Sequence, residues 1–161
     1  KKAITENLFK YYVDPKTSSI IHMAEKDTTY PIYINYNVSE INLESVKKLN
    51  GGSSYIMIGL ASFCDSIRNF KSKNQEITNI AIEFKKAFPK HEIYDCTKTK
   101  SNCNPRSHGI HFSIQKLLIF DDFVLCIIEG SIIPMNLFST DVIVFDKKGN
   151  IIRVFSSETM I

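Results

Sequence analysis

The chain has 161 residues, of which 43% are apolar and 23% are charged, and its net charge is +3. These values are typical of a folded globular domain and argue against extended disorder. The small net charge does not favour a nucleic-acid partner, because a phosphate-binding surface needs concentrated positive charge.

The chain shows no internal repeat, low-complexity tract or linker, so we expect a single domain over residues 1–161. Its longest apolar run, residues 123–128, has the length of a buried strand. A membrane-spanning helix needs roughly 20 apolar residues, so the sequence predicts no transmembrane segment.

The first part of the chain predicts a helix followed by two strands. Residues 3–12 carry apolar side chains at helical spacing, and the Asp-Pro pair that follows ends the pattern. Residues 19–23 and 30–36 are rich in Ile and Tyr, which suit the pleated surface of a sheet. Pro31 cannot donate a ladder hydrogen bond, so we expect it at a strand start or on an edge strand.

The middle of the chain predicts two helices with a strand between them. Residues 42–49 have an apolar stripe at helical spacing, and Asn42 can cap the first turn. Residues 55–61 are apolar on both faces, which is typical of a central strand. The clearest helix covers residues 74–88, where Ile, Ala and Phe recur at the 3.6-residue period until Pro89 stops it.

From residue 110 onward the pattern is almost entirely that of strands. Residues 110–120 are expected to pair with 123–129 across an Asp-Asp turn. A Gly-Ser pair and Pro134 then interrupt the pattern. Residues 140–145 and 151–156 form a closing hairpin, in which a turn glycine can adopt a positive φ. The predicted fold class is α+β, an antiparallel or mixed β-sheet with a C-terminal meander packed against two or three helices.

The four cysteines form an even set. Cys96 and Cys103 lie in the hydrophilic loop of residues 95–107 and predict a disulfide, since neither has a packing reason to be there. Cys64 and Cys126 could form a second bridge or remain reduced. A disulfide implies an oxidising compartment, so we expect a periplasmic or extracellular protein. The alternative is a cytosolic regulatory domain with four free thiols.

A zinc site is the rival use of the same loop. Cys96, Cys103, His108 and His111 supply two thiolates and two imidazoles, which together form the ligand set of a structural zinc site. Their spacing does not match the common zinc fingers, in which paired cysteines lie about two to four residues apart. We therefore expect no metal and no other cofactor.

An enzymatic function has one weak motif in its favour. The tripeptide His111-Phe-Ser113 matches the His-x-Ser/Thr element of two-histidine phosphoesterases, but those enzymes require a second such element and the sequence has none. We assign no catalytic residue. The enzymatic alternative is a small hydrolase or phosphoesterase-like protein that uses His108 and His111 with a nearby carboxylate.

The sequence favours a non-enzymatic protein-binding domain of the cell envelope or exterior, such as an immunity protein, an inhibitor or an accessory subunit of a surface assembly. Tyrosines cluster in residues 30–36, and tyrosine is enriched in contact surfaces. The other interpretation of this cluster is a strand with alternating core and rim aromatics. The candidate binding residues, from this cluster and the cysteine loop, are Tyr30, Tyr33, Tyr36, Lys98, Lys100 and Arg106.

Overall fold

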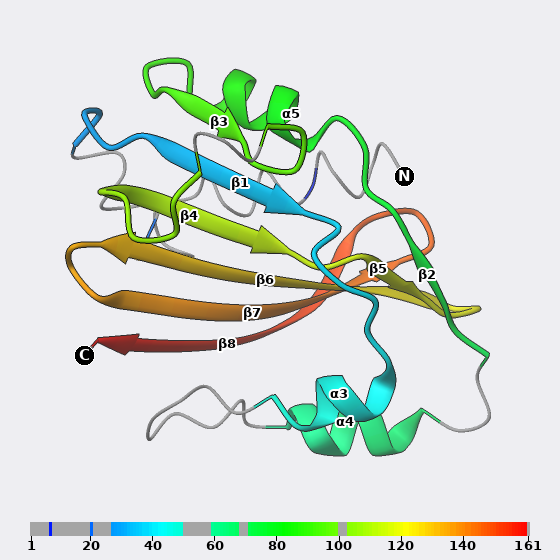
Figure 1. Cartoon of the computed structure of the whole chain (residues 1–161). Helices are drawn as coiled ribbons and strands as arrows, with labels where there is room; N and C mark the ends of the chain where they lie inside the picture. Colours follow the sequence, from blue (N-terminus) through cyan, green and yellow to red (C-terminus); the bar gives the residue numbers. More distant parts are fainter. Residues whose placement is uncertain are drawn as a thin grey trace.

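The fold is a mixed, curled sheet of eight strands with three short helices over the described residues (Figure 1). The computed structural model describes Asn7, Ile20 and residues 27–49, 59–67, 71–99 and 103–160. This architecture confirms the α+β prediction, including its C-terminal meander. No helix within these ranges is long and apolar enough to cross a membrane.

The strands pair in an order that differs from their order in the chain. The eight are β1 (Ile32–Tyr36), β2 (Lys73–Gln75), β3 (Ile93–Asp95), β4 (Gly109–Ile114), β5 (Leu117–Ile119), β6 (Phe123–Ile133), β7 (Leu137–Asp146) and β8 (Ile151–Met160). Strand β1 lies parallel between β3 and β4, whereas every other pair is antiparallel. Strands β6, β7 and β8 form the predicted meander, and β6 also pairs with β4 and β5.

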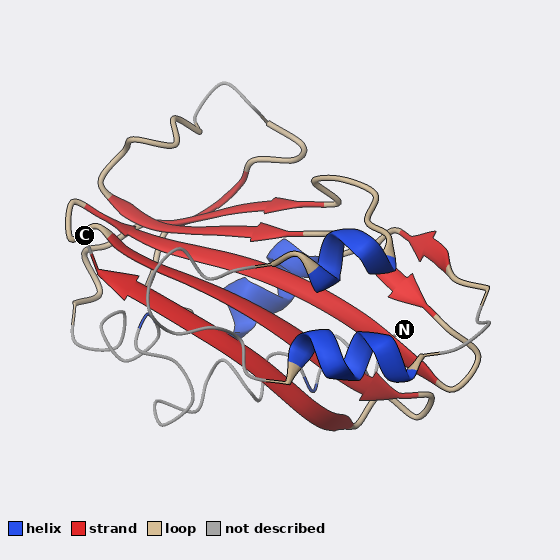
Figure 2. Cartoon of the chain, turned by 90° about the horizontal axis from the view of Figure 1, so that it is seen from below, coloured by secondary structure: helices blue, strands red, loops and turns tan. Residues whose placement is uncertain are grey.

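The helices cover opposite faces of this sheet (Figures 1 and 2). They are α3 (Leu43–Lys47), α4 (Leu60–Ser66) and α5 (Ile80–Ala87). The first core lies between the sheet and α5, and the second core lies between the sheet and the α3–α4 pair. Alternate residues of β6 pack into the two cores. Val124 and Cys126 lie in the first core, and Leu125 and Ile127 lie in the second. This double burial explains why the longest apolar run of the chain lies in β6.

Two local features follow the expected turn and cap chemistry. The Asn42 side chain accepts a hydrogen bond from the Ser45 backbone N–H at 2.9 Å and so caps α3. In the β7–β8 turn, Asp146 Oδ1 accepts from the backbone N–H groups of Lys148 and Asn150 at 2.9 Å each. The φ of Gly149 in this turn is +89°, as predicted.

The helix predicted over residues 74–88 is shorter than expected. It begins only at Ile80, because residues 73–75 pair with β5 as strand β2. The Asn74 side chain bonds both backbone groups of Ile41, accepting from its N–H at 3.0 Å and donating to its C=O at 2.9 Å. Asn74 therefore ties two distant segments together and does not cap a helix.

The prediction of a strand over residues 55–61 is wrong at the C-terminal end of that range. Leu60 opens helix α4, and Gly59 before it has a φ of +84° that breaks any extended run. Residues 55–58 lie outside the described ranges.

The predictions for residues 3–12 and 19–23 also fall almost entirely outside the described ranges. Ile20 was predicted in a strand but is helical, and it is fully buried in the first core.

The single strand predicted over residues 110–120 is divided into β4 and β5. Ile114 pairs with Ile128, but Leu118 pairs with Leu125, so one extra residue lies between the two strands opposite β6. Such a bulge bends the sheet locally, which helps it to curl.

Strand β6 is not interrupted by its Gly-Ser pair. A Cβ atom on Gly130 would lie 2.7 Å from Ile20 Cδ1 and 2.9 Å from Ser139 Oγ. Glycine is therefore present because neighbouring side chains approach the backbone closely, not because the chain turns. The turn comes later, at the cis peptide bond between Ile133 and Pro134.

Candidate functional site

Helices α3 and α4 cover the second face of the sheet over only one half of its length (Figure 2). In this covered half the face presents Ile127 of β6 and Val142 of β7, both buried. Farther along the same face the residues become polar or aromatic, with Glu129 on β6 and Phe138 on β7 exposed. No helix of the described residues covers this second half, which we call the open face. Its residues are Tyr33, Asn35, Tyr94, His111, Ser113, Glu129, Ser131, Phe138 and Thr140.

Strand register aligns five of these side chains in one row across the sheet. Tyr94 of β3 lies beside Tyr33 of β1, which lies beside His111 of β4. The row continues through Ser131 of β6 to Phe138 of β7. The rings of the first three are nearly parallel, with centroids 5.1 Å apart for the two tyrosines and 4.6 Å apart for Tyr33 and His111. Stacked rings on adjacent strands form a rigid aromatic ladder.

Backbone groups next to the ladder fix the positions of the Tyr33 and His111 rings. Gly109 opens β4 with a φ of +149°, and a Cβ there would lie 2.8 Å from the Tyr33 ring and 2.6 Å from the Pro31 carbonyl oxygen. His111 Nε2 lies 2.8 Å from the Ser107 carbonyl oxygen. A carbonyl can only accept, so Nε2 carries the proton and, in the neutral ring, Nδ1 remains an acceptor.

The predicted disulfide between Cys96 and Cys103 is present, with Cα atoms 5.6 Å apart. It forms one wall of a hollow of about 270 Å³ that also contacts Tyr33 and His111. A second hollow, of about 350 Å³, lies on the β6–β7 side of the open face, and the two share His111, Ser113 and Ser131. The cysteine loop therefore borders the open face.

Removing this disulfide should destabilise the protein moderately. The bridge closes a loop with a sequence separation of 7, and the chain-entropy model assigns about 2.5 kcal/mol to a ring of this size. We expect Cys96→Ser/Cys103→Ser to lose this amount in denaturant unfolding. Cys126→Ser is an unsuitable control because Cys126 is buried, so reduced wild-type protein serves as the comparison. An equal stability for the oxidised wild type and the double variant would contradict the prediction.

The second bridge, between Cys64 and Cys126, is not formed: both are buried free thiols. The reason is geometric, because Cys126 lies in the first core and Cys64 in the second, on opposite faces of the sheet. Burial raises the pKa of Cys126 to about 12 and also raises that of Cys64, with a smaller contribution from Asp65. Neither thiol is therefore an activated nucleophile.

Thiol titration checks this assignment. We expect the denatured, unreduced protein to release two equivalents of thiol with DTNB and the denatured, reduced protein four. The native protein should react slowly at both free cysteines, since their pKa values are raised and they are buried. Four equivalents without reductant would show that no disulfide exists.

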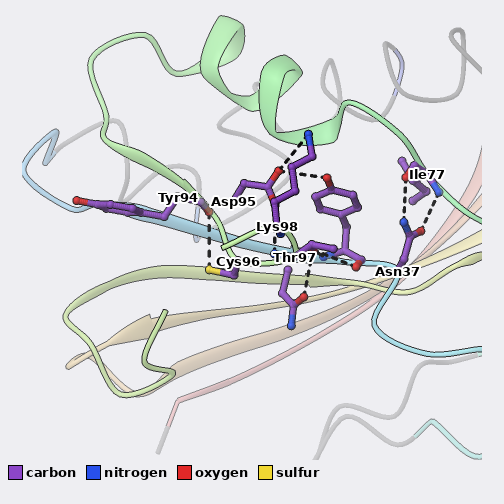
Figure 3. Close-up of polar contacts among 9 residues, drawn as sticks. Asn37, Ile77, Tyr94, Asp95, Cys96, Thr97 and Lys98 are labelled. Carbon is purple, nitrogen blue, oxygen red and sulfur yellow. Dashed lines mark hydrogen bonds and ion pairs between the residues drawn. The ribbon is translucent and has the colours of Figure 1, made fainter. Parts of the chain in front are cut away.

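A polar network at the end of β1 and β3 fixes the base of the cysteine loop (Figure 3). Asp95 Oδ1 accepts from the backbone N–H groups of Thr97 and Lys98 at 3.1 Å each, and Asp95 Oδ2 accepts from the Tyr36 hydroxyl at 3.1 Å. Burial and the neighbouring Asp95 raise the pKa of Tyr36. These residues stabilise the fold, so Tyr36 is not available as a contact residue.

The candidate binding residues thus occupy different environments. Tyr33 lies on the open face, whereas Tyr36 is buried in the first core. Tyr30 packs against that same core and stacks on His108, with ring centroids 4.4 Å apart.

The three basic candidates also differ. Lys98 lies 3.9 Å from the Asp95 carboxylate, and Arg106 is exposed in the returning arm of the loop. Lys100 lies outside the described ranges.

The two histidines of the enzymatic alternative do not meet in either of the two hollows on the open face. His111 and Ser113 line both hollows, whereas His108 lines neither and its ring stacks on Tyr30. Within the described ranges, no three His, Cys, Asp or Glu side chains are grouped to hold a metal ion. The disulfide also removes the two thiolates that the zinc alternative needed.

Six residues of the open face were missed by sequence reasoning: Asn35, Tyr94, Glu129, Ser131, Phe138 and Thr140. The available signal was the polar residues at positions 129 and 131 within the otherwise apolar strand β6. A polar stretch on one face of a long buried strand indicates that the cover over that face ends there.

Comparisons with protein-family models, with curated proteins and with solved structures found no match. Over its described residues, the protein is an α+β domain in which a disulfide borders the open face of the sheet.

Proposed function

We propose that this protein is a non-enzymatic protein-binding domain of the cell envelope or exterior, and that the open face is its contact surface. The observation that supports this most is the aligned row from Tyr94 to Phe138, in which Phe138 is 39% exposed. Stacked tyrosines offer a large contact area with little entropy to lose on binding, since neighbouring rings already hold them in place.

The disulfide supports the location in the cell envelope or exterior. Disulfides form and persist in oxidising compartments such as the periplasm and the extracellular space. A bridge that borders the contact surface fits an inhibitor, an immunity protein or an accessory subunit of a surface assembly, each of which acts by holding another protein.

Paired variants test the proposal in a capture experiment. Wild-type protein is immobilised without reductant and exposed to an envelope or culture-fluid extract of its source. Tyr94→Ser/Phe138→Ser alters the open face, whereas Ile82→Ser/Ile152→Ser alters two side chains that are 53% and 59% exposed outside it. All three proteins should give the same circular-dichroism spectrum.

We expect the wild type and the Ile82/Ile152 variant to retain the same partner and the Tyr94/Phe138 variant to lose it by at least about tenfold, as hot-spot aromatics require. Equal retention by both variants would contradict the proposed surface. Absence of any partner at about micromolar bait concentration would contradict the proposed function.

A further inference from the structure

Glu129 lies in the middle of the open face, on the floor of the larger hollow. It belongs to β6 and faces Ser113 of β4 on one side and Thr140 of β7 on the other. The hollow of about 350 Å³ contains Glu129 together with His111 and Phe138. Glutamate is disfavoured at such a position, since strands with partners on both sides prefer β-branched and aromatic residues.

No cation on the described part of the chain balances this carboxylate. The described residues that line the hollow include no lysine and no arginine. Other carboxylates of the described chain do pair with a cation. Lys116 lies 3.6 Å from both Glu40 and Glu76, and Lys86 lies 3.0 Å from Glu83. The Glu129 side chain makes no ion pair and no hydrogen bond with any described residue.

The remaining groups of the hollow are also suited to a cation. Ser113, Ser131 and Thr140, which each carry a hydroxyl group, also line it. Because His111 Nε2 is bonded to the Ser107 carbonyl, the neutral ring can present only its Nδ1 acceptor to a ligand. Phe138 adds an exposed aromatic ring, whose face attracts a cation.

We propose that this hollow takes an arginine side chain of the partner protein. A guanidinium group is planar, presents five donors in a fixed fork, and stacks on aromatic rings. It therefore matches a carboxylate flanked by acceptors and by Phe138. The inference rests on the proposed function and specifies the chemistry that the partner brings to the open face.

A small probe tests the site without the partner. N-acetyl-arginine amide is titrated into the full chain labelled with ¹⁵N, and its neutral isostere N-acetyl-citrulline amide and N-acetyl-lysine amide are titrated in parallel. The protein is used as wild type, Glu129→Gln and, as a matched control, Glu40→Gln, since Glu40 is exposed and lies outside the hollow.

We expect the arginine probe to shift the amide resonances of His111, Ser131 and Thr140 in the wild type and the Glu40 variant. Citrulline, or the loss of the Glu129 charge, should weaken binding by about tenfold or more, as for a charge-assisted bidentate hydrogen bond. Equal shifts with citrulline, equal binding by Glu129→Gln, no binding at all, or tighter binding of the lysine probe would each overturn the inference.

The two proposals fail separately. If the arginine probe does not bind but capture still depends on Tyr94 and Phe138, the open face remains the contact surface and only the arginine site is wrong. If the probe binds but capture does not depend on those aromatics, the contact surface proposed above is wrong.

Discussion

Replacing Phe112 by alanine is expected to lower the free energy of unfolding by about 3–5 kcal/mol, the usual cost of truncating a buried phenylalanine. Phe112 is 2% exposed and lies on β4, between β1 and β6. Its ring packs against Phe84 of α5, with centroids 5.2 Å apart, and it also faces Gly130 of β6. Truncation would leave a cavity where α5 meets the sheet, and a strand at the centre of a sheet can relax little to fill it.

Urea unfolding of the oxidised protein measures this effect. Phe138→Ala is the matched control, because it removes the same atoms from a ring that is 39% exposed and borders no core. The control should lose less than about 1 kcal/mol, as substitutions away from buried features usually do. Similar losses for the two variants would contradict the assignment of Phe112 to the core and of Phe138 to the surface.

Replacing Gly109 by alanine is expected to cost about 2–6 kcal/mol and to disturb the aromatic ladder. The added Cβ would lie 2.6 Å from the Pro31 carbonyl oxygen, which cannot withdraw easily because it accepts the Ile110 backbone hydrogen bond at 2.9 Å. It would also lie 2.8 Å from the Tyr33 ring. Overpacking costs roughly 1–3 kcal/mol, and a φ in this region, which residues with a side chain rarely adopt, adds roughly 1–3 kcal/mol.

Two readouts separate these effects. Urea unfolding gives the stability loss, and the near-ultraviolet circular dichroism of the tyrosines reports on the Tyr33 ring. Ser113→Ala, on the open face of the same strand, should change stability by less than about 0.5 kcal/mol. If Gly109→Ala matched Ser113→Ala in both readouts, the close approach of Gly109 to Pro31 and Tyr33 would be wrong.

Short-range chemistry explains which parts of the fold could be predicted from the sequence. The Asn42 cap, the β7–β8 turn and the Cys96–Cys103 bridge each depend on residues within eight positions of one another. The β6–β7–β8 meander follows for the same reason, since sequential antiparallel strands need only short turns.

Long-range pairing explains what could not be predicted. Strand β1 lies between β3 and β4, both more than fifty residues later in the chain, and no local pattern specifies that arrangement. The sequence shows that Tyr33 and Tyr36 must lie on opposite faces of a strand. Only the packed sheet decides that Ile34 and Tyr36 face the first core and that Tyr33 faces away from it.

The candidate site was partly predictable for the same reason. Local composition identified both the cysteine loop, which borders the open face, and Tyr33, which lies on it. Glu129 and Phe138 were missed, because their positions on that face depend on the register of β6 with β4 and β7.

Hydroxyl-radical footprinting of the captured complex tests the central claim most directly, because it reports the exposure of individual side chains before and after binding. If the open face is the contact surface, oxidation of Tyr33, Tyr94 and Phe138 should fall when the partner binds, while that of Ile82 and Ile152 stays unchanged. Protection of Ile82 or Ile152, with the open-face aromatics as reactive as in the free protein, would contradict it.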